Sequence, residues 1–94
     1  MSEVDVFKAL ADPTRLKILK CIEKGEKCIC EIIPYTLKSQ PCVSQHLKVM
    51  KHAGIIDDRK DGTKIMIKAS NDEIFKIVDQ VKKLRLMSVN HRTV

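Results

Sequence analysis

The chain has no continuous apolar run that approaches the length of a membrane-spanning helix, and no basic amphipathic segment stands apart from the rest. We therefore expect no membrane contact. The first residues, MSEVDVFK, are acidic and mixed and do not resemble a signal peptide, so we expect a cytoplasmic protein. Internal repeats, low-complexity tracts and long linkers are also missing, which predicts a single domain over residues 1–94 with a frayed tail at about residues 88–94.

Catalytic patterns are missing too. No nucleophile, base and orienting group recur at the spacing of a catalytic site, so we do not expect an enzyme. The four cysteines, in a chain without an export signal, are typical of thiols or metal ligands rather than of a disulfide framework. What the chain does have is positive charge, since 18 Lys and Arg against 12 Asp and Glu give a net charge of +6. This balance favours a polyanionic partner, and nucleic acid before membrane.

The stretch SQPCVSQHLKVMKHAG, residues 39–54, predicts a helix with both ends marked. Ser39 can cap it, Pro41 is tolerated in the first turn, and Gly54 suits a left-handed C-terminal cap. A narrow apolar stripe at helical spacing consists of Val43, Leu47 and Met50. The other faces carry Gln40, Ser44, Gln45, Lys48 and Lys51. Amides, hydroxyls and cations on a free face suit base reading in a DNA major groove, with an ordinary solvated helix as the alternative for this segment alone.

Two helices are predicted upstream of this segment. Asp12 caps the first, Pro13 opens it, and it ends near Gly25. Its expected inward side chains are Leu16, Ile18, Leu19 and Ile22. A short helix should follow between Cys30 and Leu37, and its expected inward side chains are Ile32, Ile33 and Leu37.

A β-hairpin is predicted downstream. Two β-rich runs, residues 55–60 and 64–69, are joined around Asp61-Gly62, a dipeptide that favours a tight turn. Helix, short helix, capped helix and hairpin in this order predict a winged helix-turn-helix, a mainly α fold with a small β-hairpin in the α+β class.

The two ends of the chain predict further helices. The first should cover Ser2 to Ala11, with an apolar face that includes Val4 and Phe7. The last should begin at Asp72 after a cap from Ser70 or Asn71, with a stripe made of Ile74, Ile77, Val78, Val81 and Leu84. These faces could pack within one subunit or against a second copy. We favour dimerisation, because the other helices and the hairpin already fill a small core.

Four blocks of the sequence, FKALADPTRLKILKCI, KCICEI, SQPCVSQHLKVMKHAGII and RKDGTKIMIKAS, have the order and spacing of a known family. Over about residues 4–86 the chain closely resembles the ArsR/SmtB family of small metal- and stress-sensing repressors. The resemblance implies a homodimer, joined through the first and last helices, that binds double-stranded operator DNA at a palindrome. It also implies that the repressor leaves this DNA when an inducer binds.

The predicted DNA contacts divide into three groups. The residues expected to face bases or phosphates are Gln40, Ser44, Gln45 and His46. The residues expected to position the helix on the DNA backbone are Ser39, Lys48 and Lys51. The wing would reach an adjacent minor groove or phosphates with Arg59, Lys60 and Lys64. His52, like His46, is expected to contact DNA or cap the helix end rather than to bind metal.

Cys28-Ile29-Cys30 is the second informative stretch. In an extended segment, residues i and i+2 point to the same side, so the two thiols could converge on one soft ion, whereas in a helix they would diverge. A helix N-terminus also lowers a thiol pKa. The block KCICEI resembles the Cys-x-Cys site of arsenite-, antimonite-, cadmium- and lead-responsive family members. The resemblance implies that the protein needs no obligatory cofactor. It also implies an inducer such as As(III), Sb(III) or a soft divalent metal (Cd, Pb, Zn).

The metal site departs from the family pattern, because Ile33 occupies the position of the third cysteine. Trivalent arsenic prefers three thiolates, and Cys42 could be the third ligand, although direct convergence along the helix and turn would need rearrangement. The family's zinc site on the last helix looks absent, because NDEIFKIVDQVKKLRL has no histidine. Two alternatives stay open: a thiol redox-sensing repressor that uses Cys28, Cys30 and Cys42, and a winged-helix protein-interaction or structural zinc module.

Overall fold

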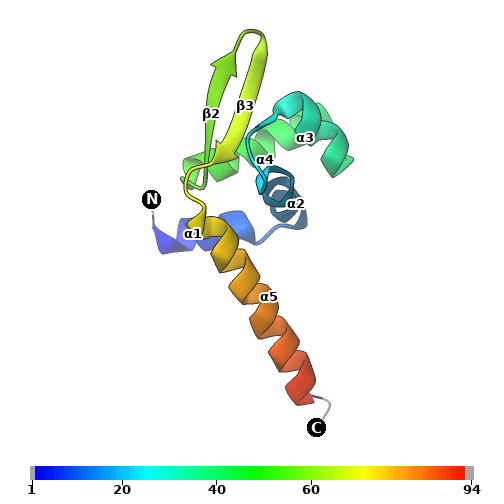
Figure 1. Cartoon of the computed structure of the whole chain (residues 1–94), viewed down its shortest axis with the longest axis vertical. Helices are drawn as coiled ribbons and strands as arrows, with labels where there is room; N and C mark the ends of the chain where they lie inside the picture. Colours follow the sequence, from blue (N-terminus) through cyan, green and yellow to red (C-terminus); the bar gives the residue numbers. More distant parts are fainter. Residues whose placement is uncertain (1, 93–94) are drawn as a thin grey trace.

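The helices and strands follow the predicted order, with one strand added. The computed structural model describes residues 2–92, and it describes side chains as far as residue 86. The helices are α1 (Glu3–Leu10), α2 (Pro13–Ile22), α3 (Ile29–Thr36), α4 (Gln40–His52) and α5 (Glu73–Arg92). The strands are β1 (Lys27–Cys28), β2 (Ile56–Asp61) and β3 (Lys64–Ala69). Figure 1 shows the hairpin of β2 and β3 and the helix α5 extending in opposite directions from the central helices.

Local capping explains where α4 begins and ends. The Ser39 Oγ accepts a hydrogen bond of 3.3 Å from the Cys42 N–H. At the other end, Gly54 has a φ of 77°, and its N–H donates to the Lys51 carbonyl at 2.9 Å. The Ile55 N–H donates to the Met50 carbonyl at 3.1 Å, which completes a Schellman motif. The predicted helix with two marked ends is confirmed.

The predicted hairpin forms one side of a three-stranded antiparallel sheet in the order β1-β3-β2. Its turn is Gly62-Thr63, since Asp61 still pairs with Lys64, and Gly62 takes a φ of 63°. The sequence did not predict β1, because a strand of two residues leaves no alternating pattern. Cys28 of β1 pairs with Met66 of β3, so the cysteine stretch is hydrogen-bonded to the hairpin.

The core lies between α2, α3, α4 and the base of the hairpin, and it includes Ile18, Leu19, Ile22, Ile32, Val43, Leu47, Met50, Ile55, Ile56, Ile67 and Ile74. Two expectations were wrong. Leu16 is 39% exposed, and Leu37 is 84% exposed. Leu37 lies just after α3 and takes a left-handed conformation (φ 59°) that turns the chain toward α4, so it caps the helix instead of continuing its buried face.

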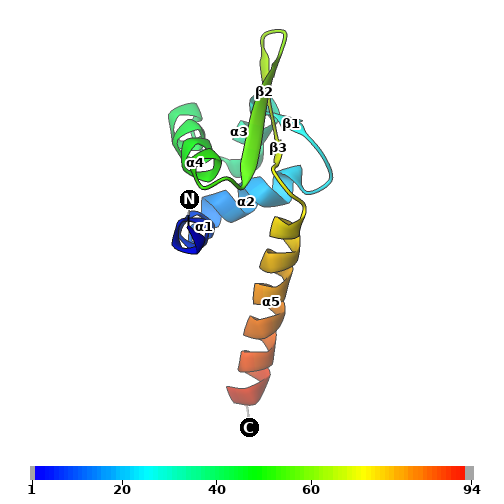
Figure 2. The same cartoon turned by 90° about the vertical axis from the view of Figure 1, so that its left-hand side faces the viewer.

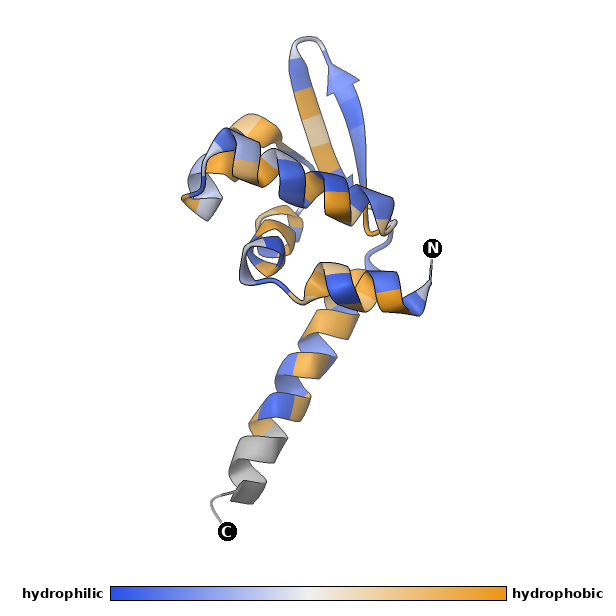
Figure 3. Cartoon of the chain, turned by 180° about the vertical axis from the view of Figure 1, so that it is seen from behind, coloured by the Kyte–Doolittle hydropathy of each residue, from blue (hydrophilic) through white to orange (hydrophobic). Residues whose placement is uncertain are grey.

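Apolar side chains stay exposed on both terminal helices. Phe7 of α1 is 63% exposed, and Leu84 of α5 is 65% exposed, with Val4, Ile77, Val81 and Leu86 also on the surface. Figures 1 and 2 show from two sides that α5 leaves the body of the protein after its first turns, and Figure 3 shows apolar residues along it. Packing within one subunit therefore accounts for Ile74, which is buried, and for Val78, which packs against the core, but not for the exposed Ile77, Val81 and Leu84.

The α5 helix runs to Arg92, so its helical backbone includes residues from Ser88 onward for which we expected a frayed tail. Residues 93–94 lie outside the described residues. Within residues 2–92, no helix combines the length and the apolar character that a membrane crossing needs.

Candidate nucleic-acid interface and cysteine pair

The turn between α3 and α4 is held by a buried hydroxyl. Thr36 is fully buried, and its Oγ1 donates to the Ile33 carbonyl at 2.9 Å and accepts from the Lys38 N–H at 3.3 Å. Together with the left-handed Leu37, these bonds fix the direction in which α4 leaves α3. The bonds of this turn therefore set the orientation of α4 relative to α3.

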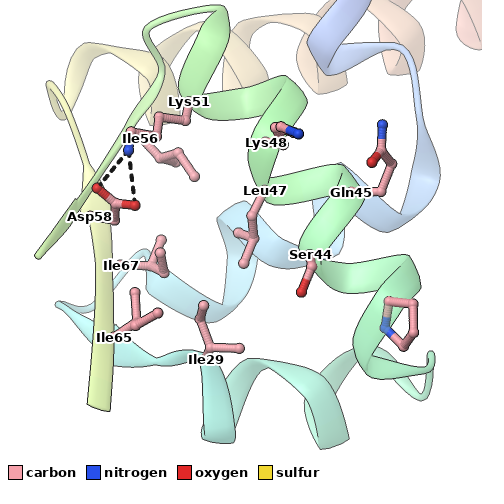
Figure 4. A pocket seen from close by; sticks show the side chains of 11 residues that line it. Ile29, Ser44, Gln45, Leu47, Lys48, Lys51, Ile56, Asp58, Ile65 and Ile67 are labelled. Atoms are coloured by element: carbon pink, nitrogen blue, oxygen red, sulfur yellow. Dashed lines mark hydrogen bonds and ion pairs between the residues drawn. The ribbon is translucent and has the colours of Figure 1, made fainter. Parts of the chain in front are cut away.

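Most of the predicted DNA contacts on α4 are exposed. The exposed residues include Ser39, Gln40, Ser44, Gln45, Lys48 and Lys51. Between α4 and the wing, which we define as β2, β3 and their turn, lies a groove of about 400 Å³ that we call the α4–wing groove. Figure 4 shows Ser44 and Lys51 on its helix side and Asp58 on its wing side. Among the described residues that line this groove, Asp58 is the one acidic residue.

Lys51 and Asp58 form an ion pair across this groove. The Lys51 Nζ lies 3.0 Å from each of the two carboxylate oxygens of Asp58. Both side chains remain partly exposed to solvent, so their attraction is screened and contributes little to stability. The predicted phosphate contact Lys51 is thus paired with a carboxylate of its own chain.

Arg59 lies on the face of the wing that points away from α4. Its Nε and Nη2 donate to the two carboxylate oxygens of Glu26 at 2.8 and 2.7 Å. These hydrogen bonds lower the pKa of Glu26 and raise that of Arg59. The alternation of side chains along a strand explains the difference from Lys60, which lies on the opposite face of β2. Within residues 2–86, Lys60 and Lys64 are exposed and make no ion pair.

His46 lies in the contact between α2 and α4, which differs from its predicted position on the DNA-reading face. Its side chain is 17% exposed, and its Nδ1 is 3.1 Å from the Arg15 Nη1. The Arg15 guanidinium also donates to the carbonyls of Ala9 (2.7 Å) and Lys8 (3.2 Å) at the end of α1. The helical spacing of the sequence indicates this half-buried position. The inward face of a helix consists of positions i, i+3, i+4 and i+7, and with Val43 as i, His46 is i+3, between Val43 and the buried Leu47 and Met50.

Asp12 completes this junction of three helices. Its Oδ1 accepts from the backbone N–H groups of Thr14 (2.8 Å) and Arg15 (3.1 Å), and lies 3.9 Å from the His46 Nδ1. Desolvation raises the pKa of Asp12, but the two backbone hydrogen bonds and nearby positive charges outweigh it, so the pKa lies below its usual value. The predicted cap of α2 is confirmed.

Cys28 and Cys30 meet at the start of α3, where the structure joins them by a disulfide with their Cα atoms 5.1 Å apart. Cys28 is buried and extended (φ −69°, ψ 146°), and Cys30 is exposed. The sequence left open whether the two sulfurs converge or diverge, and the structure brings them together. The expectation of thiols or metal ligands in place of a disulfide is not confirmed. The Cys28 N–H donates to the Glu31 carboxylate at 3.2 Å, and the Cys28 Sγ accepts from the Cys30 N–H at 3.1 Å.

The other two cysteines do not join this pair. Cys21 is buried in the core, where burial raises the pKa of its thiol. Cys42 is half-buried in the first turn of α4. Across the described part of the chain, no three His, Cys, Asp or Glu side chains gather where they could hold a metal ion. A reduced Cys28 and Cys30 would supply two sulfur ligands, which is one fewer than trivalent arsenic prefers.

Comparison with known proteins agrees with this architecture. Residues 12–58 match the family described as "Bacterial regulatory protein, arsR family". Over 81 residues the chain is 46% identical to an uncharacterized HTH-type transcriptional regulator of Methanocaldococcus jannaschii, an alignment that covers 82% of this chain and 91% of that protein. The chain belongs to the arsR family. Because the matched proteins are transcriptional regulators, membership in the arsR family also confirms that the chain is not an enzyme.

Relatives of this arsR-family chain differ in length. The arsenical resistance operon repressor of Escherichia coli is 42% identical over 63% of this chain, and the probable mercury resistance operon repressor of Streptomyces lividans is 39% identical over 77%. These alignments cover 51% and 58% of the two repressors, so the arsR-family chain matches little more than half of their length.

Solved structures confirm the winged helix-turn-helix fold. A homodimeric winged helix-turn-helix DNA-binding domain from Mycobacterium bovis, a possible ArsR-family transcriptional regulator, superposes with a TM-score of 0.82 at 25% identity. The match covers 94% of this chain and 82% of that domain. NolR from Sinorhizobium fredii superposes with a TM-score of 0.78 at 27% identity, over 86% of this chain and 81% of the other.

Proposed function

We propose that this arsR-family chain is a transcriptional repressor that binds operator DNA as a homodimer. The observation that carries the proposal is the position of α4, whose exposed face of amides, hydroxyls and cations lies beside the wing (Figure 4). Lys60 lies close to the end of β2, near the tip of the wing. A helix of this kind fits the major groove, and a wing beside it reaches the neighbouring minor groove or its phosphates. The exposed apolar residues of α1 and α5 support the second copy, because burial between two chains would remove them from water.

Base contacts are assigned to the polar residues of α4 that have no role inside the fold. These are Gln40, Ser44 and Gln45, while Ser39 and Lys48 on the helix and Lys60 and Lys64 on the wing would contact the DNA backbone. Lys51 would join the backbone contacts only when it is released from Asp58. We leave His46 and Arg59 out of this set. The first is bonded to Arg15 and the second to Glu26, so both position the elements that carry the contacts.

The inducing signal is proposed to act at Cys28 and Cys30. Cys28 ends β1, which pairs with the wing strand β3, and it also caps α3, which packs against α4. A change at its sulfur would therefore be passed directly to the wing, and to α4 through α3. A soft metal or metalloid would bind the two thiolates, with a third donor from elsewhere. Alternatively, oxidation to the disulfide would release two protons and pass two electrons to an oxidant of the peroxide or disulfide class. The resistance-operon names of the relatives support the first chemistry, and the disulfide in the structure supports the second.

The test is fluorescence anisotropy of the reduced protein on a duplex from the promoter region of its own gene. The protein is titrated separately with arsenite, cadmium, lead, zinc and a mild oxidant. Release by a metal or metalloid that is lost in Cys28→Ser establishes a metal sensor, and Cys42→Ser then tests the third ligand. Release by oxidant alone, reversed by a dithiol, establishes a redox switch. Absence of any salt-dependent duplex binding would contradict the repressor and support an interaction or structural zinc module instead.

A further inference from the structure

The α4–wing groove has a defined place in a DNA complex of the proposed kind. The major and minor grooves of a duplex are separated by a single sugar-phosphate strand. If α4 enters one groove and the wing reaches the other, that strand has to pass between them, along the α4–wing groove. The charged side chains that line it, Lys48, Lys51 and Asp58, therefore face phosphates rather than bases.

One residue that lines the α4–wing groove is negatively charged and would repel the phosphates of this strand. Asp58 carries the one carboxylate among the groove-lining residues, and Figure 4 shows it beside Lys51, which it holds at 3.0 Å. Its direct partner in the ladder is the buried Ile67, and directly opposed residues share a face of the sheet, so the carboxylate belongs to the face toward α4. A phosphate that enters the groove has to compete with Asp58 for Lys51 and is itself repelled by the carboxylate.

We propose that Asp58 limits the affinity of the chain for DNA by withholding Lys51 from the phosphate strand and by placing a negative charge beside it. This inference rests on the proposed DNA-binding function. Because phosphate contacts carry no sequence information, the limit acts on all duplexes alike. Asp58 thereby raises the share of binding energy that comes from base contacts.

The chain offers a matched control in the neighbouring residue. Asp57 lies on the same strand, and strand alternation places it on the opposite face, where its carboxylate accepts a hydrogen bond of 3.1 Å from the Ser70 hydroxyl. Asp57→Asn and Asp58→Asn change the net charge by the same amount. A difference between them therefore reports on the groove rather than on total charge.

The experiment measures anisotropy of the reduced protein on a random-sequence duplex across a salt series. For Asp58→Asn we expect about three- to tenfold tighter binding at about 0.1 M salt, and a salt slope steeper by about 0.9 per engaged protomer, because Lys51 becomes a phosphate contact. Asp57→Asn should bind like the wild type. In the Asp58→Asn background, Lys51→Gln should remove the gain.

Equal gains in Asp57→Asn and Asp58→Asn would overturn the proposal in favour of net charge alone, and so would an unchanged salt slope in Asp58→Asn. Circular dichroism and thermal unfolding check that each variant is folded, and Asp58→Ser repeats the test if Asn perturbs the hairpin. Failure of the wild type to bind any duplex would contradict the proposed function itself, a result distinct from binding that ignores Asp58.

Discussion

Two surfaces of α4 carry polar residues, but those on one surface are hydrogen-bonded inside the fold and those on the other are exposed to solvent. Toward α1 and α2, His46 is hydrogen-bonded to Arg15, which also holds two carbonyls of α1. Toward solvent, Ser44, Gln45 and Lys48 are exposed beside the α4–wing groove. The difference teaches that residue type alone does not mark a DNA contact. A polar group already bonded inside the fold positions the helix, and one left free is available to a partner.

The surface of α4 that faces α1 and α2 should contribute more to the free energy of unfolding than the exposed surface does. Arg15→Ala removes hydrogen bonds to two carbonyls and to His46, so the free energy of unfolding should fall by about 2–3 kcal/mol, as for lost charged hydrogen bonds. Lys17→Ala, an exposed cation on the same helix, should change it by less than about 0.5 kcal/mol. Urea unfolding of the two variants measures the difference. Similar losses in both would show that Arg15 is an ordinary surface residue.

The exposed surface of α4 should contribute most to the recognition of operator DNA. Gln45→Ala should weaken operator binding by about 1–3 kcal/mol while leaving random duplex nearly unchanged, because a bidentate amide contact reads a base. Lys64→Ala should weaken both duplexes by a similar factor and reduce the salt slope. Competition anisotropy with the two duplexes gives both ratios. Equal effects of Gln45→Ala on specific and random DNA would refute the division between base and backbone contacts.

A low pH should lower the free energy of unfolding through Asp12, which lies at the same junction of helices as Arg15 and His46. Its pKa is lower in the folded chain than the ordinary value of 3.8, so its carboxylate stabilises the fold above about pH 4. That contribution is lost as the pH falls through the folded pKa. Asp12→Ala should therefore cost about 1 kcal/mol at pH 7, as for a lost N-cap, and progressively less below pH 4. Urea unfolding from pH 7 to pH 2.5 follows this gap, and a gap that stays constant would contradict the assignment.

The smallest effect is expected at the turn that joins α3 to α4. Leu37 takes a left-handed conformation that costs a non-glycine residue about 1–2 kcal/mol, whereas glycine loses about 0.5–1 kcal/mol more backbone entropy on folding. Leu37→Gly should thus raise the free energy of unfolding by about 0.5 kcal/mol. Leu37→Ala keeps the strain and should be neutral. Thermal unfolding distinguishes them, and destabilisation by Gly would mean that the exposed leucine has a packing role.

Short-range physics made much of the fold predictable. The caps at Ser39 and Asp12, the left-handed Gly54 and the Asp61-Gly62 turn region involve residues a few positions apart, so their patterns are visible in the sequence. The buried stripe of Val43, Leu47 and Met50 follows from helical spacing in the same way. The candidate contacts Gln45 and Lys48 were predictable as exposed because they lie off this stripe.

The sequence by itself determined the order of the helices, the caps of α2 and α4, the hairpin and the family. Only the tertiary structure decided which polar residues are free. Arg15 and His46 are 31 positions apart, and Glu26 and Arg59 are 33 apart, so no local pattern announces either contact. The strand β1 exists only because β3 offers it hydrogen-bond partners, and through it Cys28 is joined to the wing. Local capping and periodicity depend on near neighbours, whereas these pairings arise only when distant segments are packed together.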